Sequence, residues 1–219
     1  YIAAQAHCSN DVMMGIAHQL RNPLTVIGGM ANRLLKANGE SAAMSASLEA
    51  VLGEAGRMER MMRDLVAYIK MLRSEPQFVE ISLKTILEDS LARLEKSTGH
   101  TCQASMRPEI GGSRVQADAD MLGAMFYHLL ENAMEAQLGD KNQGAVPELL
   151  VQPTADTMDD TPFVGLELCN PGILPGPESL EDLFQPFHST KTHGTGLGLA
   201  IARLAAHKNF GTVLFRVWE

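Results

Sequence analysis

Cysteine is scarce in this sequence. The 219 residues contain only Cys8, Cys102 and Cys169, which lie far apart and form no CxxC pair. Three isolated thiols are a poor basis for a disulfide framework, and they supply no ligand set for zinc. We therefore expect a protein of a reducing compartment, without a zinc site.

Positive charge is also in short supply. The chain has 18 Lys and Arg residues against 26 Asp and Glu, which gives a formal net charge of −8. A surface that binds nucleic acid needs basic residues gathered into a patch, whereas here they are scattered along the chain. The charge distribution therefore argues against nucleic acid as a partner.

Long apolar runs are missing as well. No run reaches the roughly 18 residues that span a bilayer, and the first residues, YIAAQAHCSND, lack the charged and apolar regions of a secretory signal. The chain begins without an initiator Met, inside an apolar pattern. We expect a cytoplasmic piece of a longer protein, whose absent upstream region would hold any membrane anchor.

The first third of the chain has the apolar periodicity of two helices. One pattern comprises Val12, Ile16, Leu20, Leu24, Ile27, Ala31 and Leu34 and ends before Asn38-Gly39. A second pattern, from about Ser41 to Leu72, comprises Leu48, Leu52, Ala55, Met58, Met62, Leu65, Ile69 and Leu72. Spacings of three and four predict an antiparallel helical hairpin. Such a hairpin cannot cover its own apolar face, so it either forms a dimeric four-helix bundle or packs on the rest of its chain.

After Glu75-Pro76 the pattern changes to mixed α and β. We predict helices over Leu83–Ser97, Asp118–Leu138 (with Asp118 as the N-cap) and about Gly198–His207. We predict strands over Phe78–Leu83, Val115–Ala117, Glu148–Gln152, Phe163–Cys169 and Thr212–Val217, with a polar connection between the third and fourth. The predicted fold is thus α + α/β, with a helical domain over residues 1–75 and an α/β-sandwich domain over residues 76–219.

The most specific local pattern lies in a Gly- and Pro-rich stretch. Ser189-Thr190-Lys191 is followed by Gly194-Thr195-Gly196-Leu197-Gly198-Leu199, which runs into a predicted helix. Glycines let backbone N–H groups approach phosphate oxygens, and the helix N-terminus adds a favourable dipole. The pattern is not a Walker A loop, because no GK[ST] follows. Taken alone, it predicts either a phosphate-binding loop or merely a flexible one.

A second pattern lies on the helix predicted before it. His128, Glu131, Asn132 and Glu135 follow one another at helical spacing, on neighbouring faces. Their oxygen-bearing side chains suit Mg²⁺, which keeps most of its waters and takes only one or two protein ligands. The alternative is an ordinary solvated helix face.

Together these segments resemble the motifs of bacterial two-component sensor histidine kinases, in the order that this family has them. The ATP-binding domain of that family is shared with DNA gyrase, Hsp90 and MutL. The matching segments are His18–Leu24 (H box), His128–Asn132 (N box), Asn170–Gly172 (first glycine box), Phe184–Phe187 (F box) and Gly194–Leu199 (second glycine box). The resemblance covers nearly the whole chain and implies a homodimer that uses ATP and Mg²⁺ and has a response-regulator receiver domain as its partner.

The resemblance also assigns roles to residues. It makes His18 the phosphoacceptor, flanked by Gln19, and gives Asn22 a part in hydrolysing the partner's phosphoaspartate. Asn132 is similar to the Mg²⁺-binding asparagine, with Glu131 orienting a metal-bound water. The expected nucleotide-binding residues are Asn132, His128, Asn170, Gly172, Lys191, Gly194, Thr195, Gly196, Leu197 and Gly198. Phe184 and Phe187 anchor a lid over the nucleotide or simply pack in the core.

Three positions depart from the family pattern. Gln19 stands where an acidic residue is usual and cannot hold a proton at neutral pH, although it can orient the imidazole. Asn170 replaces the aspartate that accepts from adenine, and His128 replaces a more frequent asparagine. The alternative is therefore a histidine phosphotransferase or pseudokinase relay with a weakened ATP site. An ATP-driven clamp like Hsp90 or MutL has no need of the His18 hairpin.

Overall fold

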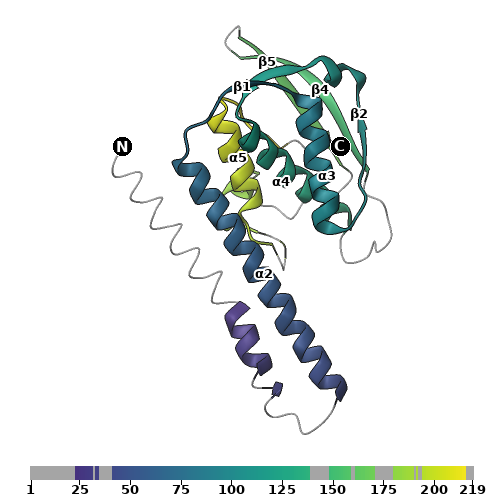
Figure 1. The fold of residues 1–219 in the computed structure, drawn as a ribbon, viewed down its shortest axis with the longest axis vertical. Helices are drawn as coiled ribbons and strands as arrows, with labels where there is room; N and C mark the ends of the chain where they lie inside the picture. Colours follow the sequence, from purple (N-terminus) through teal and green to yellow (C-terminus); the bar gives the residue numbers. More distant parts are fainter. Residues whose placement is uncertain are drawn as a thin grey trace. The chain divides into compact units, whose positions relative to one another are not determined.

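The computed structural model describes residues 23–31, 33–34, 41–138, 148–158, 161–170, 180–189, 191 and 194–215 (Figure 1). The chain falls into two compact units. One comprises residues up to 69 together with 181–197, and the other comprises residues 70–180 together with 198–219. The domain boundary that we expect after residue 75 stays a prediction. None of the described helices is both long and apolar enough to cross a bilayer.

Helices dominate the first unit. Residues 23–31 and 33–34 are helical, and α2 runs from Ser41 to Arg73, close to the range predicted from the sequence. The predicted helical hairpin is confirmed. On α2 the side chains of Met61 and Leu65 are buried, whereas other apolar side chains of the same helix stay open to solvent. The exposed ones are Leu48, Leu52, Met62, Val66 and Leu72. A short 3-10 helix, η2 (Asp182–Phe184), belongs to this unit.

The second unit is a layer of helices on two small sheets. Strand β1 (Val79–Ser82) pairs antiparallel with β3 (Arg114–Ala117). Strand β2 (Gln103–Met106) runs parallel to β4 (Glu148–Met158), which pairs antiparallel with β5 (Thr161–Cys169). Helices α3 (Leu83–Thr98), α4 (Ala119–Leu138) and α5 (Gly198–Lys208) complete the unit, with the 3-10 helix η1 (Pro108–Gly112) after β2.

Local signals explain how these helices begin and end. The Ser82 hydroxyl accepts a hydrogen bond from the Thr85 N–H, which caps the start of α3. At the other end Gly99 adopts a left-handed φ of 71°, and its N–H donates to the Glu95 carbonyl. The core that forms between α3, α4 and the three-stranded sheet contains the fully buried side chains of Leu87, Leu94, Ile110, Leu130 and Val151.

The polar connection that we predicted between the third and fourth strands is wrong. Strands β4 and β5 continue through it and pair as far as Met158 and Thr161. Arg107 donates its N–H to the Val151 carbonyl, so odd-numbered residues of β4 turn their backbone groups toward β2. Pro153 is also odd-numbered, so its missing N–H would point toward β2, but Pro153 lies past the end of that strand. Pro162 pairs with Thr157, at a position of the β4–β5 pair that makes no ladder hydrogen bond. Both prolines therefore fit without loss of a hydrogen bond.

Two other differences concern short strands. Strand β2 was not predicted, because four residues with the sequence QASM carry no strong β signal. The strand predicted over Thr212–Val217 is wrong for residues 212–215, which form no regular element, and residues 216–217 lie outside the described part. Residues 209–211 form turns on the carbonyls of α5, and Phe210 has a positive φ of 59°. The backbone thus leaves the helix in a turn rather than in a strand.

The predicted N-cap of α4 is confirmed and serves more than its own helix. Asp118 is buried, and its Oδ1 accepts from the Met121 N–H at 2.9 Å. Its Oδ2 accepts from the Gln77 N–H at 2.7 Å, while its own N–H donates to Asn209 Oδ1 at 2.7 Å. One carboxylate therefore joins the segment after α2 to the start of α4, and its backbone joins the end of α5.

We expect Asp118→Ala to lower the free energy of unfolding by about 2 to 3 kcal/mol, because two charge-assisted hydrogen bonds are lost at a buried helix start. Urea denaturation followed by circular dichroism measures the change. Asp120→Ala is the matched control, since Asp120 is exposed in the same first turn, and it should cost less than about 0.5 kcal/mol. Equal effects of the two substitutions would contradict the capping role.

Candidate functional site

Helix α4 meets the first residue of α5 at His128. The His128 side chain is buried, with 8% of its surface exposed. A Cβ built on Gly198 would lie 3.2 Å from His128 Nδ1, so a side chain at this position would require the imidazole to shift by a few tenths of an ångström. Residues that are far apart in the sequence are thereby held side by side, and the N-terminus of α5 is placed on the imidazole.

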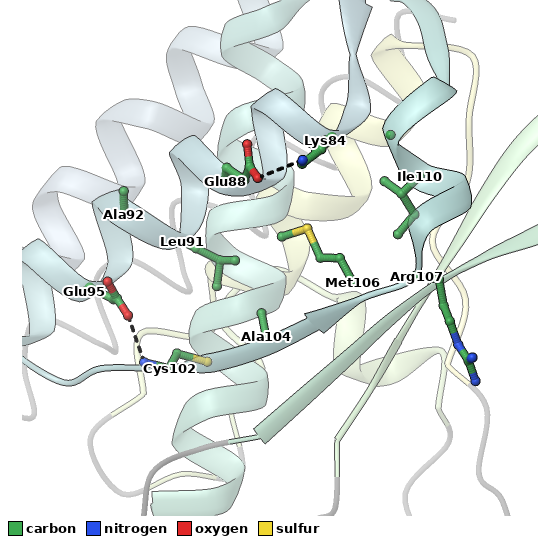
Figure 2. Close-up of a pocket in the computed structure, with 11 residues that line it drawn as sticks. Lys84, Glu88, Leu91, Ala92, Glu95, Cys102, Ala104, Met106, Arg107 and Ile110 are labelled. Carbon is green, nitrogen blue, oxygen red and sulfur yellow. Dashed lines mark hydrogen bonds and ion pairs between the residues drawn. The ribbon is translucent and has the colours of Figure 1, made fainter.

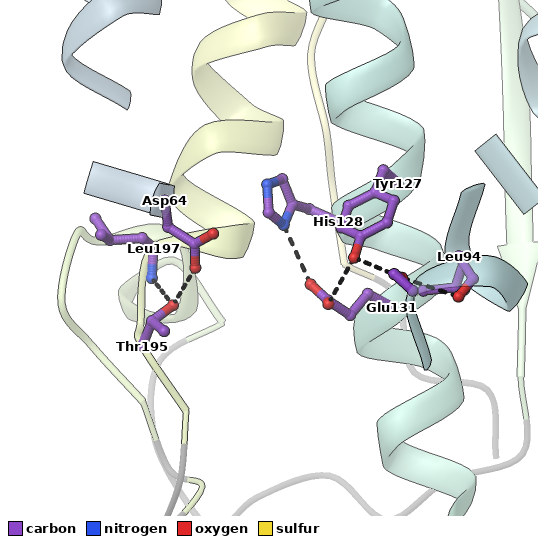
Figure 3. Close-up of polar contacts among 8 residues, drawn as sticks. Asp64, Leu94, Tyr127, His128, Glu131, Thr195 and Leu197 are labelled. Atoms are coloured by element: carbon purple, nitrogen blue, oxygen red, sulfur yellow. Dashed lines mark hydrogen bonds and ion pairs between the residues drawn. The ribbon is translucent and has the colours of Figure 1, made fainter. Parts of the chain in front are cut away.

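Glu131 is held by its neighbours on α4. Its Oε1 accepts from the Tyr127 hydroxyl at 3.2 Å, and its Oε2 lies 3.3 Å from His128 Nδ1 (Figure 3). Burial raises the pKa of Tyr127, and the nearby Glu131 carboxylate raises it further, although the hydrogen bond with Ser97 acts the other way. The phenol therefore stays protonated and donates. Glu131 orients His128 in addition to any role at a metal.

Asn132, the predicted metal ligand, lies half-buried on α4. No group of three or more His, Cys, Asp or Glu side chains that could hold a metal ion occurs in the described part of the chain. Mg²⁺ does not require such a group, because one amide or carboxylate oxygen and several waters suffice. The amide oxygen of Asn132 is a ligand of that kind, and the metal role of Asn132 and Glu131 stays a prediction. Asn170, the predicted partner of adenine, follows β5 directly and is exposed.

The loop before α5 has a tight turn that requires glycine. Gly196 has a φ of 69°, and its carbonyl accepts from the Phe187 N–H at 2.8 Å. A Cβ at this position would lie 2.5 Å from the Phe187 carbonyl carbon and 2.8 Å from both His188 N and His188 O. The backbone of residues 187–188 therefore occupies the space that any side chain at position 196 would need.

The other predicted residues of this loop differ in environment. Lys191 is exposed, and its N–H donates to the Ser189 hydroxyl, while its carbonyl accepts from the Gly194 N–H. Leu197 is fully buried. Of the two phenylalanines predicted to anchor a lid or to pack in the core, Phe184 is buried and Phe187 is half-buried. The basic head of Lys191 thus stands at the surface of a loop that is anchored by apolar side chains.

Thr195 has a partner that the sequence did not indicate. Its hydroxyl donates to Asp64 Oδ2 of α2 at 2.9 Å and accepts from the Leu197 N–H at 3.3 Å (Figure 3). All three residues belong to the same compact unit. No periodicity or motif pointed to Asp64, whereas the spacing of four residues on a helix could have revealed the Tyr127 and Glu131 pair. His18, Gln19, Asn22 and Gly172 lie outside the described residues.

Comparisons with known proteins agree with the fold. The family profile described as "His Kinase A (phospho-acceptor) domain" matches residues 9–72, and the profile "Histidine kinase-, DNA gyrase B-, and HSP90-like ATPase" matches residues 117–217. "Sensor histidine kinase ZraS" of Salmonella typhi is 29% identical over 209 residues, which cover 91% of this chain and 41% of that protein. The chain thus spans less than half the length of this curated relative.

Two solved structures share the fold. The structure titled "Acinetobacter baumannii histidine kinase AdeS" has a TM-score of 0.50 at 17% identity and covers 89% of this chain and 92% of that chain. The "Crystal structure of ShkA full-length in complex with AMPPNP" has a TM-score of 0.50 at 17% identity, over 91% of this chain and 41% of that chain. At this identity the likeness concerns the fold alone.

The two matching profiles, a phosphoacceptor domain and an ATPase domain in one chain, define the class of the protein histidine kinases. Within that class the chain belongs to the two-component sensor histidine kinases, as a catalytic core.

Proposed function

We propose that this chain transfers the γ-phosphoryl group of ATP to His18 and then to an aspartate of a response-regulator receiver domain. The observation that carries the proposal is the packing of the α5 N-terminus on His128, next to Glu131 and Asn132. The first N–H groups of a helix have no partner within the helix, and its dipole favours an anion there. A glycine-rich loop before a helix N-terminus can bind the phosphates of a nucleoside triphosphate, and the amide on the neighbouring helix can bind its metal ion.

Each residue of the site contributes one part of nucleotide binding. The N–H groups at the start of α5 bind phosphate oxygens, and the Lys191 ammonium neutralises the β- and γ-phosphates. Mg²⁺ would be held by Asn132, with Glu131 on its water shell, and would supply further neutralisation of the phosphates. Asn170 accepts from the adenine amino group without the assistance of charge, so adenine contributes less affinity than it would with aspartate.

His18 acts as the nucleophile. A neutral imidazole nitrogen attacks the γ-phosphorus with its lone pair, while the bond from phosphorus to the bridging oxygen breaks and ADP leaves. The proton of the other ring nitrogen passes to solvent, because the amide of Gln19 does not accept a proton at neutral pH. In the second step the receiver's aspartate takes the phosphoryl group from the histidine.

We expect the active form to be a homodimer. Leu48, Leu52, Met62 and Val66 of α2 are between 46% and 71% exposed, at spacings that include two steps of four. An apolar face of this kind on a helical hairpin is satisfied by a second hairpin in a four-helix bundle. This exposed face supports the dimer over packing within one chain.

Asn22 is assigned the reverse activity, the hydrolysis of the receiver's phosphoaspartate by a water bound to its amide. With Gln19 in place of a base, we expect the protein to favour this hydrolysis over autophosphorylation. Gln19→Glu should raise the autophosphorylation rate by about tenfold to 100-fold, because a general base contributes on that scale or above. The ratio of labelling rate to phosphatase rate measures the shift. Gln19→Ala is the control, and unchanged activities in Gln19→Glu would refute the hypothesis.

The purified chain incubated with γ-labelled ATP and Mg²⁺ tests the proposed function. We expect label that is lost in acid and stable in base, as a phosphohistidine is, together with saturable binding of a non-hydrolysable ATP analogue. Binding without label would mean a kinase that is locked or biased toward hydrolysis. Absence of binding would instead indicate a relay protein that has lost its nucleotide site.

A further inference from the structure

A groove on the second unit lies apart from the residues assigned to ATP. It is a pocket of about 480 Å³ between α3, β2 and η1 (Figure 2). Its apolar lining comes from Leu91 on α3, from Ala104 and Met106 on β2, and from Ile110 on η1. The proposed function uses none of these residues.

One wall of the groove is the edge of a sheet. Strand β2 pairs only with β4 among the described strands. Because the Arg107 N–H donates to Val151 of β4, odd-numbered residues of β2 face β4 and even-numbered residues face outward. The N–H and C=O groups of Ala104 and Met106 therefore point to the open edge, and no hydrogen bond of these groups is found within the described chain.

The first outward-facing N–H along this edge, that of Cys102, already has a hydrogen-bond partner. The Cys102 N–H, which also points outward, donates to Glu95 Oε1 at 3.0 Å (Figure 2). A carboxylate from α3 thus satisfies this donor, whereas the next two outward positions, Ala104 and Met106, have no such partner among the described residues. An edge strand whose N–H and C=O groups are unpaired and uncovered is a template for the addition of another strand.

Charge is unevenly distributed along the groove. Lys84 lies at the end near Ile110, where Arg107 turns its side chain away from the groove, and Glu95 lies at the opposite end beside Cys102 (Figure 2). Glu88, between them, pairs with Lys84 at 3.6 Å, and both side chains are about half exposed. An extended chain with an acidic residue at the Lys84 end and a basic residue at the Glu95 end would be complementary.

We propose that this groove binds an extended segment of a partner protein, added as an antiparallel strand to β2. Antiparallel pairing places the N-terminal end of the segment at the Lys84 end of the groove, so the segment carries an acidic residue there and a basic residue at its C-terminal end. Its alternate side chains are apolar and enter the pocket, while its backbone bonds with Ala104 and Met106. This inference is independent of the proposed kinase activity.

Two blocked heptapeptides test the proposal, Ac-Glu-Thr-Val-Thr-Val-Thr-Lys-NH2 and its charge-swapped partner Ac-Lys-Thr-Val-Thr-Val-Thr-Glu-NH2. Each is titrated into the ¹⁵N-labelled full chain, and backbone amide shifts are followed by NMR. We expect the Glu-first peptide to shift the amides of Ala104 and Met106 with a Kd on the order of 100 μM, and the Lys-first peptide to bind about threefold to tenfold more weakly.

Two variants make the test specific. Ala104→Pro removes an outward N–H that the protein's own sheet does not use, so binding should be lost while the β4 amide shifts persist. Lys84→Glu should weaken the Glu-first peptide about threefold to tenfold and strengthen the Lys-first peptide. This second variant keeps the test valid even if the proline variant does not fold. Ser105→Ala, on the opposite face of β2, is the neutral control.

Other results would overturn the proposal. Failure of both peptides to shift the β2 amides at millimolar concentration would exclude strand addition. Shifts of these amides that depend on protein concentration alone would mean that a second copy of the chain occupies the edge. Tighter binding of the Lys-first peptide to the unmodified chain would refute the antiparallel orientation.

Discussion

Replacing His18 by alanine should lower the acid-labile label from ATP by at least about 1000-fold, to background, because removal of the attacking nucleophile leaves no other route to the phosphohistidine. The nucleotide site would remain, since its residues lie on α4, on α5 and in the loop before α5. Affinity for an ATP analogue should therefore stay within about twofold. Label retained on the protein is measured after separation from free nucleotide, with calorimetry for the affinity.

His100→Ala is the matched control, since this histidine is exposed after α3 and lies outside the phosphoacceptor motif. It should keep full labelling. If the His18 variant kept its label, the phosphoacceptor would be another side chain, and the assignment of the H box would be wrong. If it lost nucleotide binding as well, loss of label would no longer identify the nucleophile.

Local sequence signals predicted the helices closely. The range of α2 differs from the prediction by one residue, and α3 begins at the predicted Leu83. Helix periodicity and capping are properties of a few neighbouring residues, as the Asp118 cap illustrates. The strands were less predictable, because β2 is recognisable as a strand only through its pairing with β4.

The candidate site shows the same division. The order of the motifs indicated that the N box and the second glycine box belong together, and the contact of His128 with Gly198 agrees. The hydrogen bond from Thr195 to Asp64 could not be foreseen, because 131 positions separate the two residues and neither motif contains Asp64. Contacts of this kind depend on how a loop is packed, which no local pattern encodes.

Gly196→Ala should weaken binding of an ATP analogue by at least about 30-fold. A non-glycine residue at a φ of 69° costs about 1 to 2 kcal/mol, and the new Cβ would meet the Phe187 carbonyl carbon at 2.5 Å. Backbone atoms cannot rotate away as a side chain can, so the hydrogen bond from Phe187 to Gly196 must open. About 2 kcal/mol corresponds to the stated loss of affinity.

Gly123→Ala is the control for the substitution itself. Gly123 lies inside α4, where an added Cβ would meet nothing within 4 Å, so alanine should leave binding unchanged and stabilise the helix by about 0.5 to 1 kcal/mol. Calorimetric titration with the ATP analogue compares the two variants. An affinity of Gly196→Ala within about threefold of the unmodified chain would mean that the turn at Gly196 opens when nucleotide binds. In that case the hydrogen bond from Phe187 to Gly196 would be present only in the loop without nucleotide. The N-terminus of α5 would then bind the phosphates without the help of this turn.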